Sequence, residues 1–102
     1  MKKYEEALIL QKQVLEIRKK YQGPQSKDII TSLDNIASNL YDSGEYEEAI
    51  QYYEEELSLM EILEPENKAR QATTLNNIAW SNLFNVGKLD EALEMTKVTH
   101  WK

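Results

Sequence analysis

A sequence unit that recurs every 42 residues constrains the fold of this chain more than any other feature. Residues 4–8 (YEEAL) reappear as residues 46–50 (YEEAI), and residues 32–37 (SLDNIA) reappear as residues 74–79 (TLNNIA). Two separate blocks share one register over a long span, which is the signature of an internal structural repeat.

The register changes once, near the end of the chain. Residues 44–50 match residues 87–93 at an offset of 43, so one residue is inserted between Trp80 and Val86. We expect a bulge or a longer turn at the end of the helix that contains this insertion.

Apolar residues within the unit have the spacing of amphipathic helices, at i, i+3, i+4 and i+7. Their members are Leu33, Ile36, Ala37 and Leu40 in the first run, and Tyr46, Ala49, Ile50 and Tyr53 in the second. Gly44 separates the two runs, at a point where a chain leaving a helix often needs a left-handed residue. Each unit is therefore predicted to be a helix, a tight turn at glycine and a second helix.

Five helices are predicted along the chain, over about 2–21, 27–42, 46–63, 67–85 and from about 88 onward. Ser26 and Asn67 are the candidate N-caps, because their short polar side chains can accept a hydrogen bond from the first turn. Gly23-Pro24 and Pro65 end the first and third helices.

We interpret residues 1–102 as one array of three parts. Residues 1–23 supply the second helix of a partial repeat, and residues 24–66 form a full repeat. Residues 67–102 form a repeat with the one-residue insertion and a shortened second helix.

The charge pattern argues against a nucleic-acid partner. Residues 1–23 carry a net charge of +3, residues 24–66 of −11 and residues 67–102 of +2. A phosphate backbone rewards a clustered basic face, which is missing here. The acidic middle is either a solvated helix face or a surface that attracts a basic segment of a partner.

The sequence holds no recognisable catalytic or metal-binding set. It has no cysteine, its single histidine is His100, and its three glycines are too far apart for a phosphate loop. No run approaches the roughly 20 apolar residues of a membrane span, and residues 1–6 lack the apolar stretch of a secretion signal. We expect a cytoplasmic protein that is not an enzyme, binds no cofactor, nucleic acid or membrane, and uses no metal.

The unit resembles the tetratricopeptide repeat, whose pattern of large, small and aromatic positions is filled by Leu33, Ile36-Ala37, Gly44, Tyr46, Ala49, Tyr53 and Leu57. Glu56 stands where a small residue is usual, and we expect it to loosen the packing of the next helix at this point. The common repeat has about 34 residues, whereas the 42-residue period resembles the kinesin-light-chain-like subgroup. The resemblance implies an all-α, antiparallel helix-pair solenoid that winds into a right-handed superhelix.

The small and aromatic residues of the pattern are expected to pack in the core. They are Tyr4, Ala7, Ala37, Tyr46, Ala49, Tyr53, Ala79 and Ala92. The first helix has no preceding partner in the array, so Leu8, Leu15 and Ile17 are expected to be exposed.

The resemblance implies that the first helix of each unit lines a concave face and that an asparagine there holds the backbone of a ligand. Asn35 and Asn77 lie 42 residues apart and so recur on one face; an amide side chain both donates and accepts hydrogen bonds. The further candidates for peptide binding are Thr31, Ser38, Thr73 and Trp80. The alternative for the two asparagines is that they tie helices together or face solvent. Trp80 either anchors a ligand or covers one end of the core.

Three functions are consistent with these features. The first is a protein-interaction scaffold that binds a peptide segment of a partner, with a basic segment favoured by the acidic middle. The second is a structural spacer, or a fragment of a longer solenoid that self-associates through its terminal helices. The third is the regulatory part of a larger enzyme or motor adaptor.

Overall fold

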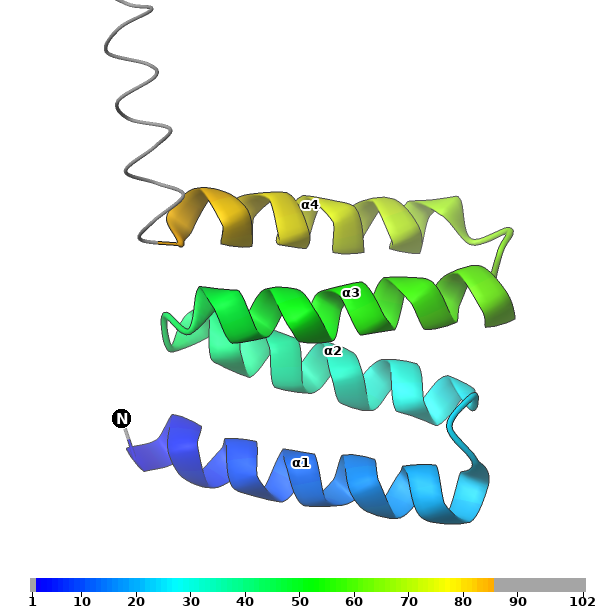
Figure 1. Cartoon of the computed structure of the whole chain (residues 1–102), viewed down its shortest axis with the longest axis horizontal. Coiled ribbons are helices and arrows are strands. Elements are labelled where there is room, and N and C mark those ends of the chain that lie inside the picture. The colour runs from blue at the N-terminus through cyan, green and yellow to red at the C-terminus, as the bar shows by residue number, and fades with distance from the viewer. Residues whose placement is uncertain (1, 86–102) are drawn as a thin grey trace, which may run out of the picture.

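The computed structural model describes residues 2–85, which form four helices (Figure 1). These are α1 (Lys2–Gln22), α2 (Lys27–Asp42), α3 (Tyr46–Leu63) and α4 (Lys68–Phe84). The first four predicted helices are confirmed to within one residue at each end. The fifth, predicted from about residue 88, lies outside the described residues. No strand occurs among residues 2–85, so this part of the chain is all-α, as predicted.

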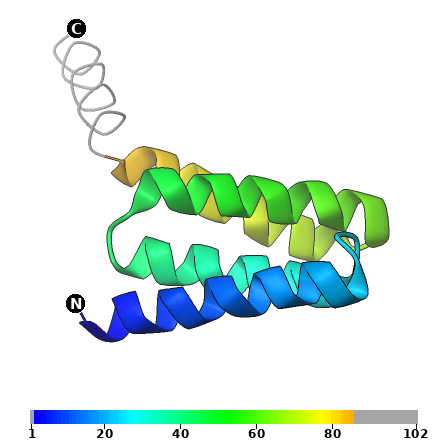
Figure 2. The same ribbon diagram turned by 60° about the horizontal axis from the view of Figure 1, so that its bottom comes forward.

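Successive helices are joined by short turns, so each runs antiparallel to the one before it (Figure 1). Figure 2 shows α1 and α3 in the nearer layer and α2 and α4 in the layer behind. Two ion pairs join the helices of the first layer: Lys12 Nζ lies 2.9 Å from Glu48 Oε2, and Lys19 Nζ lies 3.2 Å from Glu55 Oε2. This alternation of layers is the arrangement of stacked helix pairs, in which each pair packs on the next.

The turn after α2 explains the glycine in the repeat. Gly44 has a φ of +87°, and its N–H donates to the carbonyl of Tyr41 at 3.1 Å, while the N–H of Glu45 donates to Leu40 at 2.8 Å. These two bonds form a Schellman cap, which satisfies carbonyls at the end of the helix. A Cβ on Gly44 would meet no atom within 4 Å, so the backbone conformation, and not crowding, requires glycine here.

The two predicted N-caps differ in what their side chains do. Asn67 caps α4 as predicted, because its Oδ1 accepts a hydrogen bond from the Arg70 N–H at 3.2 Å. Ser26 occupies the cap position of α2 with extended backbone, but its hydroxyl makes no capping bond. The hydroxyl instead donates to Gln22 Oε1 at 3.1 Å and links the ends of α1 and α2.

The core is centred on α2 and its contact with α3. Its fully buried side chains include Ile29, Ile30, Leu33, Ile36, Ala37 and Leu40 of α2, and Ala49, Tyr53 and Met60 of α3. The first predicted stripe, Leu33 to Leu40, is therefore buried in the core; in the second, Ala49 and Tyr53 are buried, whereas Tyr46 and Ile50 are half-buried. In contrast, α1 contributes Leu15 alone to the buried apolar residues, and α4 contributes none.

Some residues predicted to lie in the core are exposed. Tyr4 is 39% exposed and Ala79 is also exposed, because among the described residues α1 packs mainly on α2, and α4 mainly on α3. Ala92 lies outside the described residues.

The prediction that three apolar residues of α1 are exposed was wrong for two of them. Leu15 is buried and Leu8 packs against the hydrophobic core, whereas Ile17 is exposed as predicted. Helix α1 carries apolar residues that face the core and others that face away from it. The repeat pattern alone did not show which residues belong to which set.

Candidate peptide-binding surface

Three of the predicted binding residues lie along α2, at successive turns of one face. Thr31 and Asn35 are exposed, so both side chains are accessible to a ligand. Ser38 is half-buried, and its Oγ lies 3.4 Å from the hydroxyl of Tyr53 on α3. Ser38 therefore links two helices, and Thr31 and Asn35 are the members of this set with free side chains.

The other three predicted residues lie along α4, in the same layer as α2 (Figure 2). Thr73 is exposed, although its hydroxyl donates to the carbonyl of Ala69 at 3.1 Å. Asn77 is half-buried. Trp80 is 50% exposed and stacks on Phe84, with ring centroids 5.6 Å apart. Trp80 therefore lies at the surface, outside the buried core.

Trp80 belongs to a row of four aromatic rings, which we call the aromatic row. Phe84 lies 6.0 Å from the ring of Tyr46 on α3, and Tyr46 lies 5.3 Å from Tyr41 on α2 in an edge-to-face contact. Such contacts are worth about 0.5–1.5 kcal/mol each beyond the area they bury. The row joins α2, α3 and α4 at one end of the bundle. Sequence reasoning named Tyr46 and Trp80 for separate reasons and did not predict that they belong to one row.

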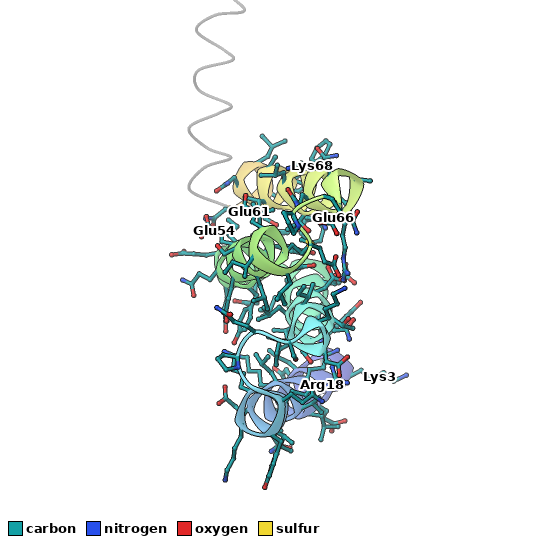
Figure 3. The ribbon with its side chains drawn as sticks, turned by 90° about the vertical axis from the view of Figure 1, so that its right-hand side faces the viewer. Lys3, Arg18, Glu54, Glu61, Glu66 and Lys68 are labelled. Atoms are coloured by element: carbon teal, nitrogen blue, oxygen red, sulfur yellow. The ribbon has the colours of Figure 1, made fainter. Side chains whose placement is uncertain are left out.

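A hollow next to Asn35 was also missed by the sequence. Side chains of α1 and α2 line it, namely Leu10, Gln11, Val14, Arg18, Ser32 and Asn35. Its volume of about 190 Å³ is below the roughly 300–1,000 Å³ of small-molecule pockets, so it can accept a side chain and not a cofactor. The guanidinium of Arg18 (Figure 3) forms one wall and donates to Ser32 Oγ at 2.7 Å and to the Asp28 carbonyl at 3.2 Å.

The role of tying helices together belongs to Asn39. Its side chain is buried, and its Nδ2 donates to the carbonyl of Tyr4 at 3.3 Å and to Gln11 Oε1 at 3.1 Å. Asn39 thus holds α2 on α1. Asn35, one turn earlier, is exposed, so the structure assigns the structural role to the neighbour that sequence reasoning had not singled out.

A buried carboxyl group lies between α2 and α4. Glu56 of α3 is 1% exposed, and its Oε1 has no hydrogen-bond partner among the described residues. Burial raises the pKa of this carboxyl to about 8, the Asp34 carboxylate adds to the rise, and Arg70 lowers it in part. Glu56 is enclosed by its neighbours, and the next helix, α4, contributes no buried apolar residue among the described residues. The repeat usually has a small residue at this position, and the buried glutamate that replaces it is held in its neutral form.

The negative charge of the middle segment is concentrated on α3. This helix has six glutamates and no basic residue. Glu48 and Glu55 pair with lysines of α1, and Glu56 is buried. The exposed glutamates that remain, including Glu54 and Glu61 (Figure 3), lie on α3. The exposed acidic side chains therefore lie mainly on α3, while Asp28 and Asp42 are exposed on α2, the helix that carries Asn35.

The described residues include neither a cluster of metal-ligating side chains nor a membrane-spanning helix. Among residues 2–85 there is no group of three or more histidine, cysteine, aspartate or glutamate side chains that could hold a metal ion. In the same part of the chain no helix is long and apolar enough to cross a membrane. His100 lies outside the described residues.

Comparison with known proteins identifies the family. The family model of the tetratricopeptide repeat matches residues 1–62, which cover α1, α2 and nearly all of α3. The chain belongs to the tetratricopeptide repeat family. Repeats of this family generally mediate protein–protein interactions and are typically non-catalytic scaffolds. A search of curated proteins found no match.

Proposed function

We propose that this chain is a protein-interaction scaffold that binds a peptide segment of a partner along the layer formed by α2 and α4. Thr31 and Asn35 offer free polar groups on α2, and Trp80 offers an exposed aromatic anchor on α4. Asparagine can pair with a peptide backbone of any sequence, and a large aromatic residue at a surface is a frequent hot spot. The observation that carries the proposal is the exposure of Asn35 beside a hollow large enough for one side chain.

The site we propose runs from the α1–α2 hollow toward the aromatic row. Asn35 and Asn77 hold the peptide backbone, Trp80 packs on one ligand side chain, and the hollow accepts another. Thr31, Ser38 and Thr73 flank this path. We further place the chain in the kinesin-light-chain-like subgroup, on the basis of its 42-residue period, and in the cytoplasm.

A display library of short random peptides tests this function without knowledge of the natural partner. Peptides selected on the wild-type chain are measured against Asn35→Ala/Asn77→Ala by isothermal titration calorimetry. Loss of two backbone hydrogen bonds is expected to weaken binding by about 1–3 kcal/mol, roughly 5- to 150-fold. Far-UV circular dichroism should show unchanged helicity.

A matched control keeps this experiment specific. Gln51 is exposed on α3, in the other layer, and Gln51→Ala should leave peptide binding unchanged. Selected peptides that bind the double variant as tightly as the wild type would show that the assigned face is wrong.

Self-association is a second candidate function, favoured by the exposed apolar residues of α1 and α4. Ile9, Leu10 and Ile17 on α1 and Leu75 and Leu83 on α4 are each at least 39% exposed. Sedimentation at several concentrations tests it. A molar mass that stays at the monomer value up to high concentration would exclude this function.

A further inference from the structure

Two acidic side chains meet where α2 packs on α3. Ser38 Oγ of α2 lies 3.4 Å from the hydroxyl of Tyr53 on α3, and the two helices are antiparallel (Figure 1). Residues three or four apart share a helix face, so Asp34, one turn before Ser38, faces Glu56, one turn after Tyr53. The two carboxyl groups are close enough for a hydrogen bond between them. We call Asp34 and Glu56 the carboxyl pair.

Helix α4 encloses the carboxyl pair from a third side. The ring of Tyr46, at the start of α3, lies 6.0 Å from the ring of Phe84, at the end of α4. The middles of these antiparallel helices therefore also lie opposite each other, which places the half-buried Asn77 of α4 near the level of Glu56. All three helices around the carboxyl pair are described. Since Asp34 directly precedes Asn35, the pair borders the proposed binding surface.

No basic side chain among residues 2–85 forms an ion pair with Asp34 or Glu56. The charge of Arg70 acts on Glu56, but its guanidinium is paired elsewhere, with Nη1 3.6 Å from Glu64 Oε1. Lys27 Nζ lies 3.9 Å from the other oxygen of the same glutamate. Asp34 is half-buried, so a positive group can reach its carboxylate from the surface.

Glu56 has a buried oxygen that the fold does not use. The residue is 1% exposed, and its Oε1 has no hydrogen-bond partner among the described residues. A buried polar atom without a partner lowers stability. The repeat does not require an acid at either position, since Val14 is equivalent to Glu56 and Asn76 is equivalent to Asp34. The carboxyl pair is therefore a feature of this one unit that helix packing does not explain.

We propose that the carboxyl pair binds a cationic side chain, lysine or arginine, of the peptide that lies along the surface between α2 and α4. The inference rests on the proposed function and names the ligand side chain that this surface selects. Ammonium and guanidinium groups only donate hydrogen bonds, which suits two carboxyl groups. The exposed Asp28 and Asp42 of α2 add negative potential around the site. A metal ion fits less well, because residues 2–85 contain no group of three metal-ligating side chains.

Binding of the cation should release a proton from Glu56 to the solvent. In the free chain, burial raises the pKa of Glu56 to about 8, so this carboxyl is mostly neutral at pH 7. A positive charge within about 4–6 Å lowers the pKa of a carboxyl group by about 1–3. The groups that face Glu56 are Asp34 on α2, Arg70 on α4 and Tyr53 on α3. Once it is ionised, Glu56 is the second negative partner of the ligand.

Peptides selected from the display library on the wild-type chain test the cation site. Isothermal titration calorimetry compares each arginine-containing peptide with a copy in which citrulline, the neutral isostere, replaces arginine. The wild type should bind the citrulline peptide at least about tenfold more weakly, whereas Asp34→Asn should bind both peptides alike. Glu54→Gln removes an exposed charge of α3 and should discriminate as the wild type does.

Proton release gives a second measurement. Titrations at pH 7 in two buffers of different ionisation enthalpy should show release of about 0.4–0.9 proton per arginine peptide, given a pKa of about 8 in the free chain. The affinity should rise about tenfold between about pH 6 and about pH 9, because less of the protein must then lose a proton. Glu56→Gln should release no proton and lose this pH dependence. Circular dichroism at each pH checks that every variant is folded.

The results that overturn this inference differ from those that overturn the proposed function. Selected peptides without basic residues, or equal binding of the arginine and citrulline peptides, would leave peptide binding intact and refute the cation site. Arginine dependence that persists in Asp34→Asn, or that releases no proton, would show that the cation binds away from the carboxyl pair. If no peptide binds the wild type, the proposed function fails and the cation site fails with it.

Discussion

The buried carboxyl of Glu56 makes the stability of this protein depend on pH in a predictable direction. Burial, helped by the nearby Asp34 carboxylate, raises the pKa of Glu56 from 4.5 to about 8 in the folded chain. The folded state therefore binds this proton more tightly than the unfolded state does. Stability from this group is fully present below about pH 4.5 and is lost as the pH rises toward about 8, beyond which the loss levels off.

The size of the effect follows from the same two pKa values. One pKa unit corresponds to about 1.4 kcal/mol, so the whole change is about 5 kcal/mol, of which about 3 kcal/mol is already lost at pH 7. Small domains have a total stability of about 5–15 kcal/mol. The titration of one carboxyl group is therefore comparable with the stability of the entire fold.

Glu56→Gln removes this titration while keeping nearly the same volume. Urea unfolding, followed by far-UV circular dichroism, should be measured for both proteins at about pH 5 and about pH 9. We expect the wild type to lose about 3–5 kcal/mol between these values and the variant to lose much less. At pH 7 the variant should be more stable than the wild type.

The other groups that face Glu56 are Asp34 on α2, Arg70 on α4 and Tyr53 on α3 itself. The pKa of Tyr53 is raised above its ordinary value of 10, chiefly by burial, so its titration falls outside the tested range. Glu54→Gln, at an exposed site on α3, controls for the loss of a glutamate. If the wild type and Glu56→Gln lose equal stability over this range, the carboxyl is already charged in the folded protein and the reasoning is refuted.

Three further predictions concern stability and are checked by urea unfolding. Leu33→Ala should lower the free energy of unfolding by about 2–5 kcal/mol, because it leaves a cavity in the core. Leu75→Ala, at the equivalent but exposed position, should lower it by less than about 1 kcal/mol. Equal losses for the two variants would contradict the assigned burial. Gly44→Ala should cost about 1–2 kcal/mol, because the left-handed backbone disfavours a Cβ, and an unchanged midpoint would show that the turn relaxes. Asn67→Ala should cost about 1 kcal/mol through loss of the cap on Arg70, while Ser26→Ala, which removes no cap, should cost less; the reverse order would contradict the hydrogen bonds described.

Local structure was predictable because its causes lie close together in the sequence. The apolar spacing of α2 identified the stripe from Leu33 to Leu40, and Gly44 identified the turn that ends this helix. Asn67 was recognisable as a cap because the bond it accepts comes from a residue only three positions away. The charge argument for a basic ligand stays a prediction, because a net charge is a sum along the chain and does not say which helix carries the exposed charges.

The candidate site was predicted less completely, since its parts come from different helices. Asn35 and Asn77 became candidates through their common register in the repeat, and their role stays a prediction. The hollow beside Asn35 depends on Leu10 and Arg18 of α1, and the aromatic row depends on Tyr46 lying between Tyr41 and Phe84. No local sequence pattern predicts such contacts between helices, because they depend on how the helices pack.

The 42-residue recurrence by itself determined the helix-pair unit, the turn residues and the family. The tertiary structure decided which copies of each position are covered. Leu33 and Leu75 occupy the same place in the repeat, yet the first is fully buried and the second is 53% exposed; Val14 is apolar and exposed where its equivalent Glu56 is acidic and buried. The physical reason is that helical spacing encodes the direction in which a side chain points, whereas burial and pKa depend on whether another helix lies in that direction.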